Sequence, residues 1–228
     1  MSSETQQVTG EATAATHRGI LFVVSSPSGG GKGTLIQRVL KRLPDLSYSV
    51  SYTTRKPRNG EEHGREYFFV TRDQFAEMIE RNDFLEWANV HSHLYGTSRN
   101  QVATDVSSGR DIVLEVDVQG ASSIRNLISD SVSVFILPPS LEVLRERLIS
   151  RGTDSPDELA VRLRNAPEEL KSYKTFDYVI INDDVEQAAA KLMAIIEGER
   201  MRLARQEEKI KRVVESFLLS NEQRSGTS

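Results

Sequence analysis

Three consecutive glycines followed by a lysine mark the stretch of this chain most able to do chemistry. The stretch Ser25-Ser26-Pro27-Ser28-Gly29-Gly30-Gly31-Lys32-Gly33-Thr34 follows an apolar run, Ile20 to Val24, and precedes a helical pattern. Because glycine has no Cβ, successive backbone N–H groups can converge there on an anion, and the following helix presents its positive end to it. Lys32 adds a mobile positive charge. The stretch therefore predicts a phosphate-binding turn.

This stretch departs at two positions from the P-loop template G-x-x-x-x-G-K-[ST]. Gly31 and Lys32 match its last glycine and its lysine, but Ser26 replaces its first glycine. Gly33 stands where a hydroxyl would hold Mg²⁺, and Thr34 follows one residue later. A plain turn between a strand and a helix is the alternative. The order of strand, glycines, lysine and amphipathic helix favours phosphate binding. The apolar face of that helix consists of Leu35, Ile36, Val39, Leu40 and Leu43.

Two arginines lie on a short constrained segment further along the chain. Arg55 and Arg58 are three residues apart, and Pro57 and Asn59-Gly60 favour turns that break any helix there. Two guanidinium groups held in this way could clamp one phosphate group. Scattered surface arginines are the alternative interpretation.

More arginines lie where two predicted helices meet. A helix over Ser140–Ser150 is interrupted by Arg151-Gly152-Thr153-Asp154, and Ser155 then caps a new helix. Arg147 and Arg151 lie on one arm of this pair and Arg162 on the other. The pattern predicts a hinged lid whose arginines reach a triphosphate.

Two carboxylates end a strand predicted over Asp111–Asp117. Glu115 and Asp117 are two residues apart, so we expect them to share a face at the carboxyl end of the strand, where open parallel sheets bind ligands. A carboxylate there could orient a Mg²⁺-bound water or a substrate amine. A solvated strand end is the alternative.

The elements that must position these residues alternate between strand and helix, which predicts an α/β P-loop fold with three layers, α/β/α, and a parallel central sheet. Between Ser51 and Asn100 the rhythm changes to short strands around one helix, which indicates an inserted mixed subdomain. We expect a core of residues 18–50, 101–139 and 163–199, a nucleotide-monophosphate-binding subdomain of residues 51–100, a helical lid of residues 140–162, a disordered tail of residues 1–17, and a C-terminal helix and tail of residues 200–228.

Local patterns predict the individual elements. Strands are expected over Leu46–Tyr52, Tyr67–Val70, Phe84–Val90, Val132–Leu137 and Tyr178–Ile181. A helix over Thr71–Arg81 begins with a capping box of Thr71 and Gln74, and Leu94–Thr97 turns the chain into another helix with a second capping box of Ser98 and Gln101.

The C-terminal region has an apolar stripe of its own: Ile210, Val213, Val214, Phe217 and Leu218. Such a stripe more often packs on its own domain, and otherwise forms a contact in a homo-oligomer. From Ser220 onward we expect disorder.

Composition excludes several classes of protein. At 228 residues, with 38% hydrophobic residues, the chain suits one domain with insertions. It contains no cysteine, which excludes disulfides and thiolate metal sites and favours the cytoplasm. The net charge of −4 argues against nucleic acid as a partner. No run approaches the roughly 20 apolar residues of a membrane span, so we expect no membrane partner.

Taken in order, these motifs resemble the guanylate kinases from about Gly19 to Glu199. The most specific parts are the glycine stretch, Ser51-Tyr52-Thr53-Thr54-Arg55-Lys56-Pro57-Arg58-Asn59-Gly60-Glu61, His63-Gly64-Arg65-Glu66-Tyr67-Phe68-Phe69, Tyr95-Gly96-Thr97, Glu115-Val116-Asp117-Val118-Gln119-Gly120, Ile136-Leu137-Pro138-Pro139-Ser140, Arg151-Gly152-Thr153 and Asn182-Asp183-Asp184. The resemblance implies phosphorylation of GMP to GDP, and likewise of dGMP to its diphosphate, by direct in-line transfer from ATP with Mg²⁺.

The same resemblance implies roles for individual residues. GMP would be bound by Ser51, Arg55, Arg58, Tyr67, Glu86, Tyr95, Thr97 and Glu115, and ATP by Ser26, Pro27, Ser28, Gly29, Gly30, Gly31, Lys32, Gly33, Thr34, Arg147, Arg151 and Asn182. The cations of the transfer step would be Lys32, Arg55, Arg147, Arg151 and Arg162. Asp117 would hold Mg²⁺ through water, with no metal site made by protein alone. For Glu86 the chemistry agrees, since a carboxylate accepts the adjacent N1 and N2 donors of guanine together.

Two departures and two rival functions accompany this resemblance. Ser26 replaces a glycine, and Glu115 is one methylene longer than the aspartate of other members, which affects the expected contact there. One rival is an interaction module that binds phosphorylated peptides, although such modules tend to lose the glycines and lid arginines present here. The other rival is a P-loop kinase acting on another small phosphate ester.

Overall fold

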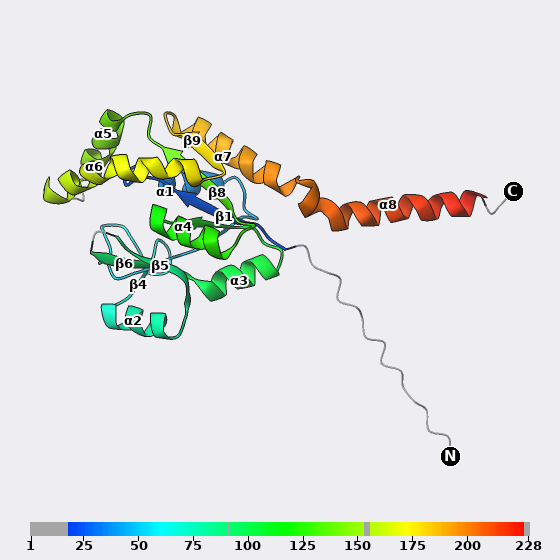
Figure 1. The fold of residues 1–228 in the computed structure, drawn as a ribbon, viewed down its shortest axis with the longest axis horizontal. Coiled ribbons are helices and arrows are strands. Elements are labelled where there is room, and N and C mark those ends of the chain that lie inside the picture. Colours follow the sequence, from blue (N-terminus) through cyan, green and yellow to red (C-terminus); the bar gives the residue numbers. More distant parts are fainter. Residues whose placement is uncertain (1–17, 91, 153–155, 226–228) are drawn as a thin grey trace, which may run out of the picture.

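The larger of two sheets forms the centre of the molecule. The computed structural model describes residues 18–90, 92–152 and 156–225 (Figure 1). The sheet has the order β2-β7-β1-β8-β9, and every neighbouring pair in it is parallel. Its strands are β1 (Leu21–Ser25), β2 (Ser47–Tyr48), β7 (Ile112–Glu115), β8 (Val132–Leu137) and β9 (Tyr178–Ile181). The predicted parallel central sheet is confirmed.

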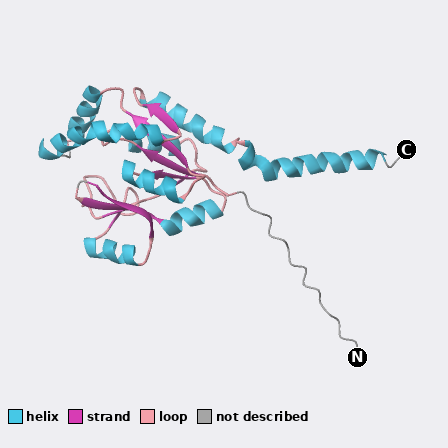
Figure 2. Cartoon of the chain, viewed as in Figure 1, coloured by secondary structure: helices cyan, strands magenta, loops and turns pink. Residues whose placement is uncertain are grey.

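Helices cover both faces of this sheet, because its central strands are apolar on both sides. Phe22 and Val24 of β1 pack in one cluster with α1 (Lys32–Leu40) and α7 (Val185–Arg200). Leu21 and Val23 pack in the other cluster with α3 (Arg99–Ser107) and α4 (Val118–Leu127). Because side chains alternate along the strand, β1 thus contributes residues to two separate cores. The predicted three-layer arrangement is confirmed (Figure 2).

A second, mixed sheet lies beside the core and is built from residues 52–98. Its order is β4-β3-β6-β5, from β3 (Tyr52–Thr53), β4 (Phe68–Phe69), β5 (Phe84–Val90) and β6 (His93–Ser98). Helix α2 (Arg72–Glu80) begins with the predicted capping box of Thr71 and Gln74. It packs on this sheet through Phe75, whose ring stacks on Phe84 at 4.4 Å between centroids. Figure 1 shows this unit below the central sheet.

Three local expectations around this sheet are wrong. The strand expected over Leu46–Tyr52 is divided between β2 in the large sheet and β3 in the small one. Leu94–Thr97 belong to strand β6 rather than to a turn. Gly96 serves packing there, because a Cβ at this position would lie 2.7 Å from the ring of Phe84. The capping box at Ser98 is half formed, since the side chain of Gln101 donates to the carbonyl of Tyr48.

The lid predicted over residues 140–162 covers α5 (Leu141–Arg151) and the first part of α6 (Pro156–Lys171). Helix α6 continues beyond the predicted boundary and is followed by a short 3₁₀ helix (Ser172–Thr175). Leu144, Leu148 and Ala166 form a small core of their own between the two helices. Gly152 ends α5 in the left-handed conformation, with φ +60°. The predicted cap at Ser155 and the tail of residues 1–17 lie outside the described residues.

The last helix, α8 (Leu203–Ser225), extends away from the two sheets (Figure 1). The expectation that its apolar stripe packs on its own domain is wrong, because Val213, Phe217 and Leu218 are 50%, 68% and 59% exposed. The helix also continues through Ser220, where disorder was expected, to Ser225. Among the helices in the described ranges, none is both long and apolar enough to span a bilayer.

Candidate active site

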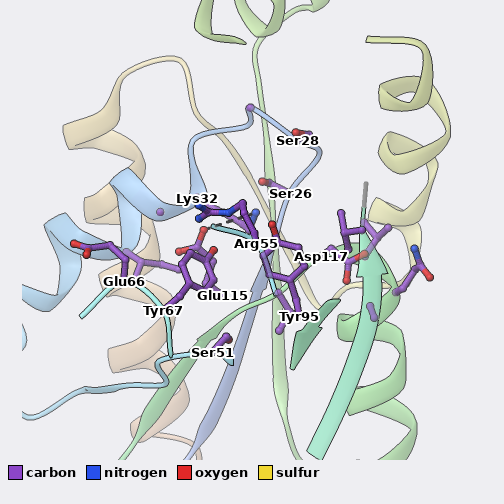
Figure 3. Close-up of a pocket in the computed structure, with 18 of the residues that line it drawn as sticks. Ser26, Ser28, Lys32, Ser51, Arg55, Glu66, Tyr67, Tyr95, Glu115 and Asp117 are labelled. Atoms are coloured by element: carbon purple, nitrogen blue, oxygen red, sulfur yellow. Dashed lines mark ion pairs between the residues drawn. The ribbon is translucent and has the colours of Figure 1, made fainter. Parts of the chain in front are cut away.

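A cavity of about 790 Å³ opens between the glycine turn, the small sheet and helix α6. In Figure 3 the side chains of Lys32, Arg55 and Tyr95 lie close together around this space. The predicted site residues that line it are Ser26, Ser28, Gly29, Gly31, Lys32, Gly33, Thr34, Ser51, Arg55, Arg58, Tyr67, Glu86, Tyr95, Glu115, Asp117 and Arg162. The predicted residues Pro27, Gly30, Thr97, Arg147 and Asn182 are not in its lining. The side chain of Arg151 lies outside the described part of the structure.

The glycine turn is held open at the start of α1 by close contacts that leave no room for side chains. Gly31 has φ +91°, and a Cβ there would lie 2.5 Å from Nδ2 of Asn182. That amide donates to the carbonyl of Gly30 at 3.0 Å, so Asn182 supports the turn from behind. A Cβ on Gly33 would lie 3.2 Å from both carboxylate oxygens of Glu115. The glycines therefore let the backbone and the acid approach each other.

Arg147 lies on the same rear side of the turn. Its Nη2 donates to the carbonyl of Asn182 at 2.8 Å. Its Nη1 is buried, and among the described residues it has no hydrogen-bond partner. A buried donor without a partner costs free energy, so this nitrogen is available to an anion that reaches the turn. Direct contact between Arg147 and ATP stays a prediction.

Lys32 lines the cavity beside Glu115. Its Nζ is 3.7 Å from Oε1 of Glu115, and the hydroxyl of Tyr48 donates to the other carboxylate oxygen at 3.4 Å. Burial and the charge of Glu115 raise the pKa of Tyr48 far above its usual value. Tyr48 therefore remains a proton donor to this carboxylate at neutral pH.

Arg55 is positioned by an acid to which the sequence had assigned no role. Its Nη1 and Nη2 donate to the two carboxylate oxygens of Glu61 at 2.7 and 2.9 Å, and the two side chains are only 10% and 17% exposed. The backbone N–H of Arg58 donates to the same carboxylate at 2.8 Å. Although burial acts in the opposite direction, these bonds lower the pKa of Glu61. Because a guanidinium has five N–H donors, the pairing orients Arg55 without using all of them.

Glu86 is a buried carboxylate at the other side of the cavity, on β5. Its Oε1 accepts a hydrogen bond from the hydroxyl of Thr97 at 2.6 Å. Burial raises the pKa of Glu86 to about 7, against the effect of the Thr97 bond and with a contribution from the charge of Asp117. Gly120 makes room for this group, since a Cβ there would lie 2.6 Å from Oε2 of Glu86. Thr97 thus stands behind Glu86 instead of lining the cavity.

Helix α6 is hydrogen-bonded to the glycine turn at Ser28. Arg162 donates through Nη1 to the hydroxyl of Ser28 at 2.8 Å, and the backbone N–H of Ser28 donates to Glu169 at 3.0 Å. The predicted lid arginine therefore reaches the phosphate-binding turn. Glu169 was not identified from the sequence, where it is one of several acids on a helix.

Asp117 is not the end of a strand, as expected, but the N-cap of α4. Strand β7 ends at Glu115, and the Asp117 side chain accepts from the backbone N–H of Gly120 at 2.9 Å. The carboxylate still lines the cavity, as does Thr34. Among the described residues, no three His, Cys, Asp or Glu side chains gather in a metal-binding group. Oxygen donors of this kind fit Mg²⁺ held mainly by substrate phosphates and water.

Comparison with known proteins agrees with this geometry. Residues 18–199 match the guanylate kinase family. A guanylate kinase of Thermotoga maritima is 45% identical over 86% of this chain and 94% of its own length. One of Dechloromonas aromatica is 51% identical over 78% of this chain and 88% of its own length. The crystal structure of guanylate kinase from Anaplasma phagocytophilum superposes with a TM-score of 0.72 at 33% identity, covering 84% of this chain and 91% of that one. The chain belongs to the guanylate kinase family.

Proposed function

We propose that this cavity catalyses the ATP-dependent phosphorylation of GMP to GDP, and so supplies guanine nucleotides. The observation that carries this assignment is that one cavity joins a glycine turn with Lys32 to a second wall bearing Arg55, Tyr67 and Glu86. The first wall suits the phosphates of ATP, and the second suits a phosphate with a guanine base. We place the reaction in the cytoplasm, a proposal supported by the absence of cysteine.

The reaction needs no protein nucleophile. The second pKa of a phosphate monoester is about 6, so an oxygen of the GMP phosphate is largely anionic at neutral pH and attacks the γ-phosphorus in line. The barrier is the approach of two anions, which cations must neutralise. Lys32 and the lid arginines Arg147, Arg151 and Arg162 serve the ATP side, and Arg55 and Arg58 serve GMP.

Mg²⁺ would bind between the ATP phosphates and this chain, where it would neutralise charge on the β- and γ-phosphates. Asp117 would hold it through water, and the hydroxyl of Thr34 lies on the same cavity. The N-cap bond of Asp117 to Gly120 fixes the carboxylate, which supports an orienting role. The lid helix α6, which touches Ser28, would exclude water from the transfer.

An acceptor assay tests this function and its rivals. Purified enzyme with MgATP is expected to form ADP with GMP, more slowly with dGMP, and at background rates with AMP, UMP and CMP. Equal or better use of another monophosphate would assign the protein to a different P-loop kinase. Absence of ADP formation with every acceptor would instead favour a peptide-binding module.

Removing the acid that orients Arg55 is expected to weaken GMP binding. Glu61→Gln keeps the size of the side chain but loses the charge of the bidentate pair, so Arg55 is less well oriented. We expect the KM for GMP to rise about 10-fold with a smaller change in kcat, because a charge-assisted hydrogen bond contributes about 1.5–3 kcal/mol. Initial rates at saturating ATP measure both constants.

Glu62→Gln is the matched control for this prediction. Glu62 is the neighbouring residue, carries the same charge, and its side chain is 70% exposed. The variant Glu62→Gln should leave the KM for GMP unchanged. An unchanged KM in Glu61→Gln, or an equal rise in both variants, would contradict the orienting role of Glu61.

Binding of GMP should weaken as the pH falls below about 7. The pKa of Glu86 is about 7 in the empty site, and guanine pairs with the ionised carboxylate. At pH 6 only about one tenth of a group with this pKa is ionised. Protonation of Glu86 should therefore by itself raise the Kd for GMP about 10-fold when the pH falls from 8 to 6. Calorimetry without ATP or metal measures this Kd. Glu86→Gln should retain only the smaller change due to the GMP phosphate, and an equal pH dependence in both proteins would contradict the prediction.

A further inference from the structure

Helix α8 carries an apolar face that the described part of the chain leaves uncovered. Its members recur at helical spacing and are between 40% and 68% exposed: Ile210, Val213, Val214, Phe217 and Leu218. A shallow groove of about 300 Å³ runs along the same side, lined by Leu203, Glu207, Ile210, Lys211, Val214 and Glu215. Figure 1 shows the helix extending away from both sheets.

The start of α8 is fixed to the body of the enzyme by polar contacts. Arg205 donates to the carbonyl of Asp130 at 3.2 Å, and the side chain of Gln206 donates to the carbonyl of Arg200 at 2.6 Å. The family match ends at residue 199, so the apolar face belongs to a segment beyond the matched catalytic region. A continuous exposed apolar face of this kind marks an interface.

We propose that α8 pairs with α8 of a second copy of this chain, in antiparallel orientation about a two-fold axis between Val213 and Val214. Under this symmetry Ile210 of one copy faces Phe217 of the other, and Val213 faces Val214. Four members of the apolar face thus map onto one another, as an isologous interface requires, and Leu218 lies at the edge of the paired segment. The helix is roughly 35 Å long, at about 1.5 Å per residue, so the paired segment spans several turns.

Charge and shape agree with this orientation. Lys211 and Glu215 flank the same side of the apolar face, and across the two-fold axis Lys211 of one copy lies within one residue of the level of Glu215 of the other, which favours two opposite-charge contacts. The catalytic body is attached at one end of α8, as Figure 1 shows. Antiparallel pairing places the two bodies at opposite ends, whereas parallel pairing would bring them together at one end.

Sedimentation velocity of the full chain over a wide concentration range tests the pairing. We expect a reversible dimer whose Kd rises at least about 100-fold in Val214→Glu, because the variant buries a charge in the interface. Leu219→Glu is the matched control, since Leu219 lies nine residues from Ile210 and so on the opposite side of the helix. It should dimerise like the unchanged chain. A monomer at all concentrations would overturn the proposal, as would a dimer that Val214→Glu leaves intact.

Cysteine cross-linking tests the orientation, and the absence of cysteine from the sequence makes it specific. Ile210→Cys and Phe217→Cys should form an intermolecular disulfide when mixed, because these positions face each other. Each variant alone should cross-link poorly, since its two cysteines would be about 10 Å apart along the helix axis. Efficient cross-linking of each variant alone, or none in the mixture, would overturn the antiparallel arrangement. Unchanged GMP kinase activity in Val214→Glu would show that the variant remains folded.

Discussion

Replacing Lys32 with alanine is expected to lower kcat for GMP phosphorylation by about 10²–10³-fold while changing the KM for GMP by less than about threefold. Lys32 begins α1 and lines the cavity, with its Nζ 3.7 Å from Oε1 of Glu115. The ammonium group of Lys32 is expected to stabilise the negative charge that is redistributed over the transferring phosphoryl group. This interaction is stronger in the transition state than in the ground state, so its loss lowers kcat. Without it, the positive end of α1 and the bound metal remain, so activity should fall without disappearing.

Lys41→Ala is the matched control for this experiment. Lys41 is exposed and caps the other end of the same helix, so the variant removes the same charge away from the cavity. Its kcat should equal that of the unchanged enzyme. Because Lys32→Ala also leaves Glu115 without its positive neighbour, thermal unfolding must accompany the kinetics. Near-normal kcat in folded Lys32→Ala would contradict the role assigned to this lysine, and so would an equal loss in Lys41→Ala.

The core of the fold could be predicted from the sequence because its signals are local. Strand β1 is buried on both faces and therefore appears as an uninterrupted apolar run before the glycines. The next helix, α1, repeats its apolar residues at helical spacing, and the strand predicted over Tyr178–Ile181 has the bounds observed for β9. Strand β1 and helix α1 depend on the burial of their own side chains, which the order of residues records directly.

The parts that could not be predicted depend on contacts between distant or competing groups. The sequence around Asp117 is compatible both with the end of a strand and with the cap of a helix. Which of the two forms depends on where β7 stops pairing with β1. Gly96 suggests a turn by composition, yet it is needed because the ring of Phe84 passes over it. The pairing of Glu61 with Arg55 requires the folded loop between them.

The site combines cations with carboxylates that keep them in place. Lys32 is paired with Glu115 and Arg55 with Glu61, and Arg162 reaches Ser28 beside Glu169. Local pairing holds positive groups around the cavity even though the whole chain has a net charge of −4. An acid paired with a guanidinium or an ammonium group fixes the orientation of that cation before the nucleotides bind.

Replacing Glu86 with glutamine is expected to reduce kcat/KM for GMP by about 10²–10³-fold and to raise it for AMP. In the proposed complex the carboxylate would accept both adjacent N–H donors of guanine, whereas an amide would accept only one and turn its own donor toward the other. The lost charged hydrogen bond and the new clash of donors together cost about 3–4 kcal/mol. Adenine presents a donor beside an acceptor, which an amide matches. Rates of ADP formation with GMP and AMP measure the ratio of the two kcat/KM values.

The fold should tolerate the substitution Glu86→Gln, so a change in the ratio of GMP to AMP activity would report on base recognition and not on unfolding. The amide oxygen can still accept from Thr97, and the variant removes a buried charge whose pKa is raised to about 7. A group with a raised pKa stabilises the folded state at low pH and loses that contribution as pH rises, so at pH 8 Glu86→Gln should unfold at the same or a higher temperature. Glu80→Gln, exposed on α2, is the matched control and should keep the selectivity for GMP. An unchanged ratio of GMP to AMP activity in folded Glu86→Gln would remove Glu86 from guanine recognition.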